Sequence, residues 1–245
     1  MTTAVTIKDL RKEYKDVVAV KGLDLEIMEG ELFSLLGVNG AGKTTTIKML
    51  STLTTPTSGD ALIYGFSVRK EPEKVKEIID ISMQETAVAR KLTVEENIEF
   101  YSKLSGQTPE ETEKVKEYIY NAFNLDSVAK KQASKLSGGW QRKLSIALAL
   151  VTKPKILFLD EPTLGLDVIA RRDLWKTIRE LKENMTIILT THYMEEAEAL
   201  SDRIGVMKDG ELLFVGKKDE MFAKTGKANV EDAFIEIVSG GELDG

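Results

Sequence analysis

The residues with the clearest chemistry form a glycine-rich run at residues 37–44, Gly-Val-Asn-Gly-Ala-Gly-Lys-Thr, which fits the pattern G-x-x-x-x-G-K-[ST]. Glycines allow close backbone approaches that a side chain would block, so the loop N–H groups can point at phosphate oxygens. The Lys43 amine then reaches the β- and γ-phosphates, and the Thr44 hydroxyl binds Mg²⁺. This pattern predicts a nucleotide-binding P-loop, with a glycine-rich turn that happens to hold a lysine as the alternative. The residues expected to contact the nucleotide here are Gly37, Asn39, Gly40, Ala41, Gly42, Lys43, Thr44 and Thr45.

Two adjacent carboxylates, Asp160 and Glu161, follow an apolar run at residues 156–159. Such a run is typical of a buried parallel strand, and open α/β sheets bind ligands at the carboxyl ends of their strands. Asp160 is placed to hold the Mg²⁺ shell, and Glu161 to polarise an attacking water as general base. Paired carboxylates are also common on surfaces, but this run downstream of a P-loop favours the catalytic interpretation.

A second anion-binding motif is Ser137-Gly138-Gly139, which precedes an apolar stretch predicted to be a buried helix. Helix N-termini favour anions because their free N–H groups and dipole face the ligand. Alone, the motif is explained about as well by an N-cap serine on a loop glycine, but its place beside a P-loop, at the end of a helical insertion, favours anion binding. One nucleotide needs one P-loop, so two anion sites in one chain pose a geometric problem. A twofold dimer solves it if the second motif of each subunit covers the nucleotide of the other.

The elements that must position these motifs alternate between strand and helix patterns. The P-loop lies between a predicted strand at 31–36 and a predicted helix at 45–50. Residues 4–36 are strand-rich with a turn at Lys21-Gly22, and a turn at 58–60 leads into a short strand. The alternation predicts a mostly parallel sheet with helices on both faces. The remaining predicted elements are strands at 61–65, 78–83, 155–159 and 186–190, helices at 168–183, 195–202 and 230–238, and a hairpin of 204–208 with 211–215 around Asp209-Gly210.

A helical insertion interrupts this alternation. Thr93 with Glu96, and Thr108 with Glu111, fit capping boxes, and strand signals are few between residues 92 and 152. We predict an α/β fold, a P-loop NTPase core with an antiparallel N-terminal β region and a helical subdomain insertion. The expected boundaries are a single domain at 4–238, with its core at 4–85 and 153–238, the helical subdomain at 86–152 and a tail at 239–245.

The composition narrows the possible partners. The net charge is −6 and the pI is near 5.2, whereas a nucleic-acid binder usually shows a basic face, so we expect no nucleic-acid partner. The absence of cysteine excludes disulfides, thiolate chemistry and cysteine-based metal sites. The N-terminus has no signal-peptide core, and no apolar run approaches the length of a bilayer span. If this chain works at a membrane, we expect another chain to supply the membrane part.

Over residues 4–238 the chain resembles the ATP-binding subunit of ABC transporters. The resemblance rests on the P-loop, on Asp160-Glu161 and on residues 136–141, Leu-Ser-Gly-Gly-Trp-Gln, which resemble the family's signature loop. The commonest family form has Gln where this chain has Trp140, whose role is left open beside simple packing at a helix start. The resemblance implies ATP and Mg²⁺ as cofactors and a head-to-tail homodimer, or a heterodimer with a similar subunit, that encloses two ATP molecules. It also implies a transmembrane permease partner and a peripheral location on the cytoplasmic face of the cell membrane.

The resemblance assigns roles to four further residues. His192, the only histidine, follows a predicted strand and would contact the γ-phosphate, although a lone histidine is more often structural. Gln84 resembles the Q-loop glutamine that meets Mg²⁺ and water. Asp167 lies in a segment like the D-loop at the dimer interface, and it also suits the N-cap of the next helix. Tyr14 resembles the aromatic residue that stacks on adenine, with an ordinary strand tyrosine as its alternative. The choice of ATP over GTP rests on the resemblance alone.

Three alternatives compete with a transporter ATPase. An ABC-type ATPase without a transport role, such as a cluster-assembly ATPase, has a similar length. A P-loop kinase or GTPase leaves residues 136–141 and His192 unexplained. A purely structural nucleotide-binding module is disfavoured by the complete set of Lys43, Asp160 and Glu161. Residues 229–236 resemble a short helix in a prokaryotic subgroup of drug, sodium and polysaccharide exporters, which favours export.

Overall fold

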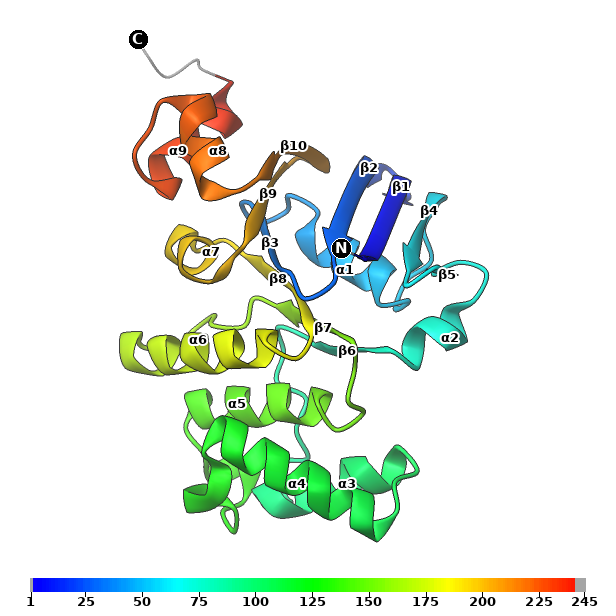
Figure 1. Cartoon of the computed structure of the whole chain (residues 1–245), viewed down its shortest axis with the longest axis vertical. Coiled ribbons are helices and arrows are strands. Elements are labelled where there is room, and N and C mark those ends of the chain that lie inside the picture. Colours follow the sequence, from blue (N-terminus) through cyan, green and yellow to red (C-terminus); the bar gives the residue numbers. More distant parts are fainter. Residues whose placement is uncertain (1, 241–245) are drawn as a thin grey trace.

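Two β-sheets of different kinds pack on helix α1 (Lys43–Leu50) in the computed structural model, which describes residues 2–240 (Figure 1). The helices α3 (Val94–Leu104), α4 (Pro109–Phe123) and α5 (Gly138–Ala149) gather at one end of the molecule, and α8 (Lys218–Thr225) and α9 (Val230–Ser239) lie at the opposite end (Figure 1). No helix within residues 2–240 combines the length and apolar character that a membrane span requires.

The smaller sheet is antiparallel and comes from the N-terminal region, as predicted. Its spatial order is β2-β1-β4-β5. Its strands are β1 (Thr3–Tyr14), β2 (Val17–Met28), β4 (Ser58–Ile63) and β5 (Phe66–Ser67).

The turn predicted at Lys21-Gly22 is wrong, because both residues lie inside β2. Gly22 has a left-handed φ of 103° where the β1–β2 register shifts, and a Cβ there would lie 2.7 Å from Asp9 Oδ1. The glycine therefore marks a bulge in a continuous strand. The turn predicted at 58–60 is also wrong, since these residues already belong to β4.

The larger sheet carries the predicted parallel strands in the order β10-β9-β3-β8-β7-β6. All its neighbouring pairs are parallel except β9–β10, which form the predicted hairpin. Leu36 pairs with Thr191, and Asp160 pairs with Thr190. The carboxyl ends of β3, β7 and β8 therefore meet at one edge. The strands are β3 (Leu32–Leu36), β6 (Ile79–Ser82), β7 (Ile156–Asp160), β8 (Thr186–Thr191), β9 (Arg203–Lys208) and β10 (Glu211–Gly216).

The two faces of this sheet are covered differently. In β7, Ile156 and Phe158 join an apolar cluster with α1 and the antiparallel sheet, whereas Leu157 and Leu159 join one with α5 (Gly138–Ala149) and α6 (Val168–Lys182). Helices α1 and α5 thus lie on opposite sides of the sheet (Figure 1). The predicted helices on both faces are present, and the antiparallel sheet adds a layer behind α1.

The helical segment follows the sequence pattern closely. Both predicted capping boxes are formed, with Thr93 Oγ1 accepting from Glu96 N at 3.2 Å and Thr108 Oγ1 accepting from Glu111 N at 3.3 Å. These boxes begin α3 (Val94–Leu104) and α4 (Pro109–Phe123).

The C-terminal region follows the prediction less completely. Helix α7 (Met194–Leu200) agrees with the sequence, whereas α2 (Pro72–Lys76) and α8 (Lys218–Thr225) were not predicted. Helix α9 (Val230–Ser239) runs into the first residue of the predicted tail, whose residues 241–245 lie outside the described part of the chain.

Candidate functional site

A cleft of about 650 Å³ opens where β3, β7 and β8 end. Seven of the eight predicted P-loop residues line it, together with Gln84, Glu161 and His192. The exception is Gly37, whose carbonyl bonds Lys43. Residues Val17, Val18 and Ala19 at the start of β2 also line the cleft, and the sequence patterns did not indicate them.

The P-loop glycines are required by backbone geometry and by close packing. Gly40 and Gly42 have left-handed φ angles of 83° and 104°. A Cβ at Gly42 would lie 2.4 Å from Ala19 O, and one at Gly37 would lie 2.3 Å from Met207 O. Helix α1 begins at Lys43 without a side-chain cap. The N–H donors of its first turn are therefore left for an anion in the cleft.

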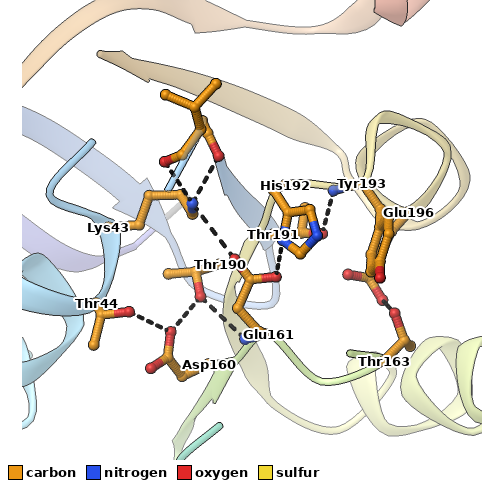
Figure 2. Close-up of polar contacts among 12 residues, drawn as sticks. Lys43, Thr44, Asp160, Glu161, Thr163, Thr190, Thr191, His192, Tyr193 and Glu196 are labelled. Carbon is orange, nitrogen blue, oxygen red and sulfur yellow. Dashed lines mark hydrogen bonds and ion pairs between the residues drawn. The ribbon is translucent and has the colours of Figure 1, made fainter. Parts of the chain in front are cut away.

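Lys43 links the P-loop to the carboxylates (Figure 2). Its buried amine donates to the carbonyls of Gly37 at 2.7 Å and Val38 at 3.1 Å, and it lies 3.4 Å from Glu161 Oε1. Burial lowers the pKa of Lys43, and the nearby Glu161 and Asp160 partly offset this effect. The amine thus lies between the loop and the predicted base.

Asp160 and Thr44, which the sequence predicts to hold Mg²⁺, are in direct contact. Asp160 Oδ1 accepts from Thr44 Oγ1 at 3.0 Å and from Thr190 Oγ1 at 2.6 Å (Figure 2). Asp160 Oδ2 is buried and has no hydrogen-bond partner among the described residues. A hydroxyl beside an unsatisfied carboxylate oxygen is the oxygen donor set that suits Mg²⁺. Gln84 is exposed and lines the wall of the cleft.

Glu161 and His192 are in direct contact. His192 Nδ1 lies 2.7 Å from Glu161 Oε2, and Glu161 is only 6 % exposed. Glu161 has a left-handed φ of 48°, a conformation that costs a non-glycine residue about 1–3 kcal/mol and persists only where its surroundings hold it. Its N–H donates to both the carbonyl and the hydroxyl of Thr190, each at 3.1 Å.

The motif Ser137-Gly138-Gly139 lies outside this cleft. It begins α5, on the opposite side of the sheet from α1, and none of the three residues lines the cleft. Ser137 and Gly138 are exposed, and Ser137 makes no side-chain capping bond. The chain therefore does not bring its two predicted anion sites together.

Trp140 packs at the start of α5. It is partly buried against the helical apolar cluster, and Lys143 Nζ lies 4.9 Å from its ring centroid. These contacts agree with the packing alternative.

Asp167 and Tyr14 are not among the residues that line the cleft, although Tyr14 pairs with Val17, which does. Asp167 Oδ1 accepts from the N–H groups of Ile169 and Ala170, both at 2.9 Å, so it caps α6. Tyr14 ends β1 and is 44 % exposed, with Lys12 Nζ 4.8 Å from its ring centroid.

The sequence patterns did not indicate two buried charged residues that lie beside the site. Glu196 on α7 accepts with Oε1 from Thr163 Oγ1 at 2.8 Å and from Trp175 Nε1 at 2.9 Å, and burial raises its pKa. Arg142 is buried on α5 and donates to backbone carbonyls around the cleft. A charged residue inside an apolar helix was the only available signal for Arg142.

The parallel sheet, the P-loop and the Asp-Glu pair define a P-loop nucleotide hydrolase. The ABC transporter family profile matches residues 20–164, more than half of the chain. The chain belongs to the ABC transporter family, as its ATP-binding ATPase domain. This outcome confirms the resemblance and the predicted fold class.

Individual relatives agree with this assignment. The linearmycin resistance ATP-binding protein LnrL of Bacillus subtilis is 40% identical over 89% of this chain and 71% of its own length. ABC transporter A family member 9 of Dictyostelium discoideum is also 40% identical, but the chain spans only 29% of that protein.

Solved structures show the same fold. The ATP-binding subunit of an ABC transporter has a TM-score of 0.85 and 27% identity, covering 96% of this chain and 99% of that one. A dimeric ATP-binding cassette bound to ADP and Pi in a post-hydrolysis state has a TM-score of 0.78 and 28% identity, covering 87% and 98%.

Proposed function

We propose that this chain binds Mg²⁺ and ATP in the cleft and drives substrate transport through a partner permease. The observation that carries the proposal is the convergence of Lys43, Thr44, Asp160, Glu161 and His192 at one edge of the sheet. Family membership supplies ATP hydrolysis, and the transporter names of the relatives support the coupling to transport.

The geometry supports a division of labour among these residues. Lys43 and the first turn of α1 would hold the phosphates. Thr44 and Asp160 would hold Mg²⁺, with Gln84 at the cleft wall, and the bound ion would neutralise charge on the phosphate oxygens. Glu161 would accept a proton from water, and His192 at 2.7 Å would fix the orientation of that carboxylate. Tyr14, beside the start of β2, would stack on the base.

The exposed start of α5 supports a dimer that encloses two nucleotides. Ser137, Gly138 and Gly139 would bind the nucleotide held by the partner subunit, and Asp167 would lie along the interface. The related cassette solved with ADP and Pi is described as dimeric, which agrees with this arrangement. The partner subunit would be a second copy or a similar ATPase chain.

The permease would dock on the helical subdomain, which we place at 86–152 of a single 4–238 domain. The chain would then sit peripherally on the cytoplasmic face of the cell membrane. Export is favoured because LnrL is named for linearmycin resistance. Human ABCA3, 39% identical over 88% of this chain, is named a phospholipid-transporting ATPase, which supports a transport role.

Purification from membranes tests the transport role. The tagged chain is solubilised in mild detergent, and the chains that elute with it are identified by mass spectrometry. We expect a multi-spanning membrane protein to elute with the tagged chain in a fixed ratio. In membranes that lack this protein, a salt wash should remove the tagged chain. Elution with soluble partners alone would instead support an ATPase without a transport role.

A further inference from the structure

Arg142 makes an unusual set of bonds for a buried residue. It is 4 % exposed, and its guanidinium donates to four backbone carbonyls. Nε donates to Pro162 O at 2.8 Å, and Nη2 donates to Asp160 O at 2.8 Å. Nη1 donates to Met83 O and to Gln84 O, the latter at 3.3 Å. One side chain on α5 therefore holds two other segments of the chain.

The acceptors lie at functional positions. Asp160 and Pro162 flank Glu161, whose left-handed backbone needs support from its surroundings. The Thr190 hydroxyl accepts a hydrogen bond from the N–H of Glu161, and Arg142 donates to the carbonyls of the residues before and after Glu161. Met83 and Gln84 form the segment that leads from β6 into the helical region.

Only arginine has the donors for this arrangement. Its guanidinium presents five N–H groups in a rigid plane, whereas lysine presents one compact ammonium. Burial lowers the pKa of Arg142 to about 10, and the carboxylates of Asp160, Glu196 and Glu161 partly offset the effect. The side chain therefore keeps its charge at neutral pH while its bonding partners are all backbone oxygens.

We propose that Arg142 is a positioning residue that couples the start of α5 to Glu161 and Gln84. The proposal deepens the proposed function, because it requires Glu161 to be the base and Ser137 to meet a nucleotide. A shift of α5 when Ser137, Gly138 and Gly139 engage the partner's ATP would move the guanidinium. That movement would change the backbone on both sides of Glu161, so the base becomes aligned only when the second site is engaged.

The test compares Arg142→Lys and Arg142→Gln with the matched control Lys143→Met. Lys143 is the next residue on α5 and is also buried, but it pairs with Asp173 of α6 instead of the cleft backbone. For both Arg142 variants we expect kcat to fall on the order of 10-fold to 100-fold, as small misplacements of reacting groups do. We expect KM for ATP and monomer nucleotide affinity to stay within about twofold, the pattern of an interaction used only in the transition state. Lys143→Met should keep kcat within about twofold even where its melting temperature falls.

A double-mutant cycle with Ser137→Ala tests the coupling itself. If Arg142 transmits the state of the second site, the double variant should turn over no more slowly than the slower single variant. Additive losses, or a folded Arg142→Lys variant with wild-type kcat, overturn the proposal.

Amide hydrogen exchange tests the same coupling without a change at Arg142. With ATP present, Ser137→Ala should speed exchange at residues 83–85 and 160–163. Unchanged exchange at both segments overturns the proposal. If neither Arg142 variant folds, this hydrogen-exchange experiment alone tests the coupling. The proposed function fails separately if Glu161→Gln or Ser137→Ala alone keeps wild-type turnover.

Discussion

The P-loop cleft and the start of α5 are both predicted to bind phosphate, yet they are built in opposite ways. In the cleft, hydrogen bonds and an ion pair of 2.6–3.4 Å join Lys43, Thr44, Asp160 and Glu161 to one another, to the backbone or to the Thr190 hydroxyl. At the start of α5, Ser137 is exposed and its hydroxyl caps nothing. The cleft is organised from within, whereas the start of α5 faces outward.

Under the proposed function, this difference explains how one chain would hold a nucleotide and still need a partner. The bonds made by Lys43, Thr44 and Asp160 order the groups proposed to bind phosphate and Mg²⁺ before any ligand arrives, which lowers the cost of aligning them. An exposed helix start offers its donors to whatever approaches from outside. We infer that the cleft binds the nucleotide and contains the base, and that the start of α5 in the second subunit completes the site.

Removing the base of the cleft should have the largest effect. Glu161→Gln keeps the size of the side chain and an acceptor oxygen but cannot take a proton. We expect kcat to fall on the order of 10²-fold or more, measured by phosphate release. ATP-dependent dimers should persist and be visible by sedimentation. Turnover at the wild-type rate would refute the assignment of Glu161.

Changing the exposed motif should separate binding from turnover. We expect Ser137→Ala to slow turnover on the order of 10-fold to 100-fold, because it removes one donor to the nucleotide charge. Nucleotide affinity of the monomer, measured with a fluorescent ATP analogue, should not change. Ser134→Ala, at an exposed serine on the same connection, is the control and should behave like wild type. Weaker binding by the Ser137→Ala monomer would contradict the contrast between the two regions.

A smaller effect should appear in the pH dependence of stability. Burial raises the pKa of Glu196 above its ordinary value of 4.5, so the folded state binds more protons than the unfolded state above that pH. The free energy of unfolding should therefore decline as pH rises above 4.5, until Glu196 ionises in the folded state, by about 1.4 kcal/mol for each unit of raised pKa. Glu196→Gln should flatten this decline in urea titrations. The exposed neighbour variant Glu195→Gln should keep it, and an unchanged slope in Glu196→Gln would disprove a buried proton at Glu196.

The sequence predicted the parts of this molecule that local patterns determine. Buried strands such as β3 and β7, both capping boxes and the Asp209-Gly210 hairpin follow from short-range periodicity and turn chemistry. The sequence also predicted that Asp160, Glu161 and the P-loop would lie at one edge of the sheet, because the carboxyl ends of neighbouring parallel strands must lie together.

The errors arose where a distant segment decides the local structure. Gly22 resembles a turn residue, but its pairing with β1 keeps it inside a strand. Arg142 lies 59 residues from Met83 in the chain, so its role depends on how the helical segment folds back. Sequence spacing alone does not predict which carbonyl groups a guanidinium will contact.

Helix α8 was missed for a different reason. Its eight residues carry few apolar side chains, and Met221 is the one that is buried.

The most direct test of the two-subunit site mixes two inactive variants. Lys43→Ala disables the cleft, and Ser137→Arg blocks the start of α5 with a bulky cation. In a mixed dimer, the intact cleft of the Ser137→Arg chain faces the intact α5 start of the Lys43→Ala chain. We predict that each variant alone hydrolyses ATP at background rate, while the mixture regains activity that peaks at equal amounts of the two chains. A mixture as inactive as its components would contradict a site shared between subunits.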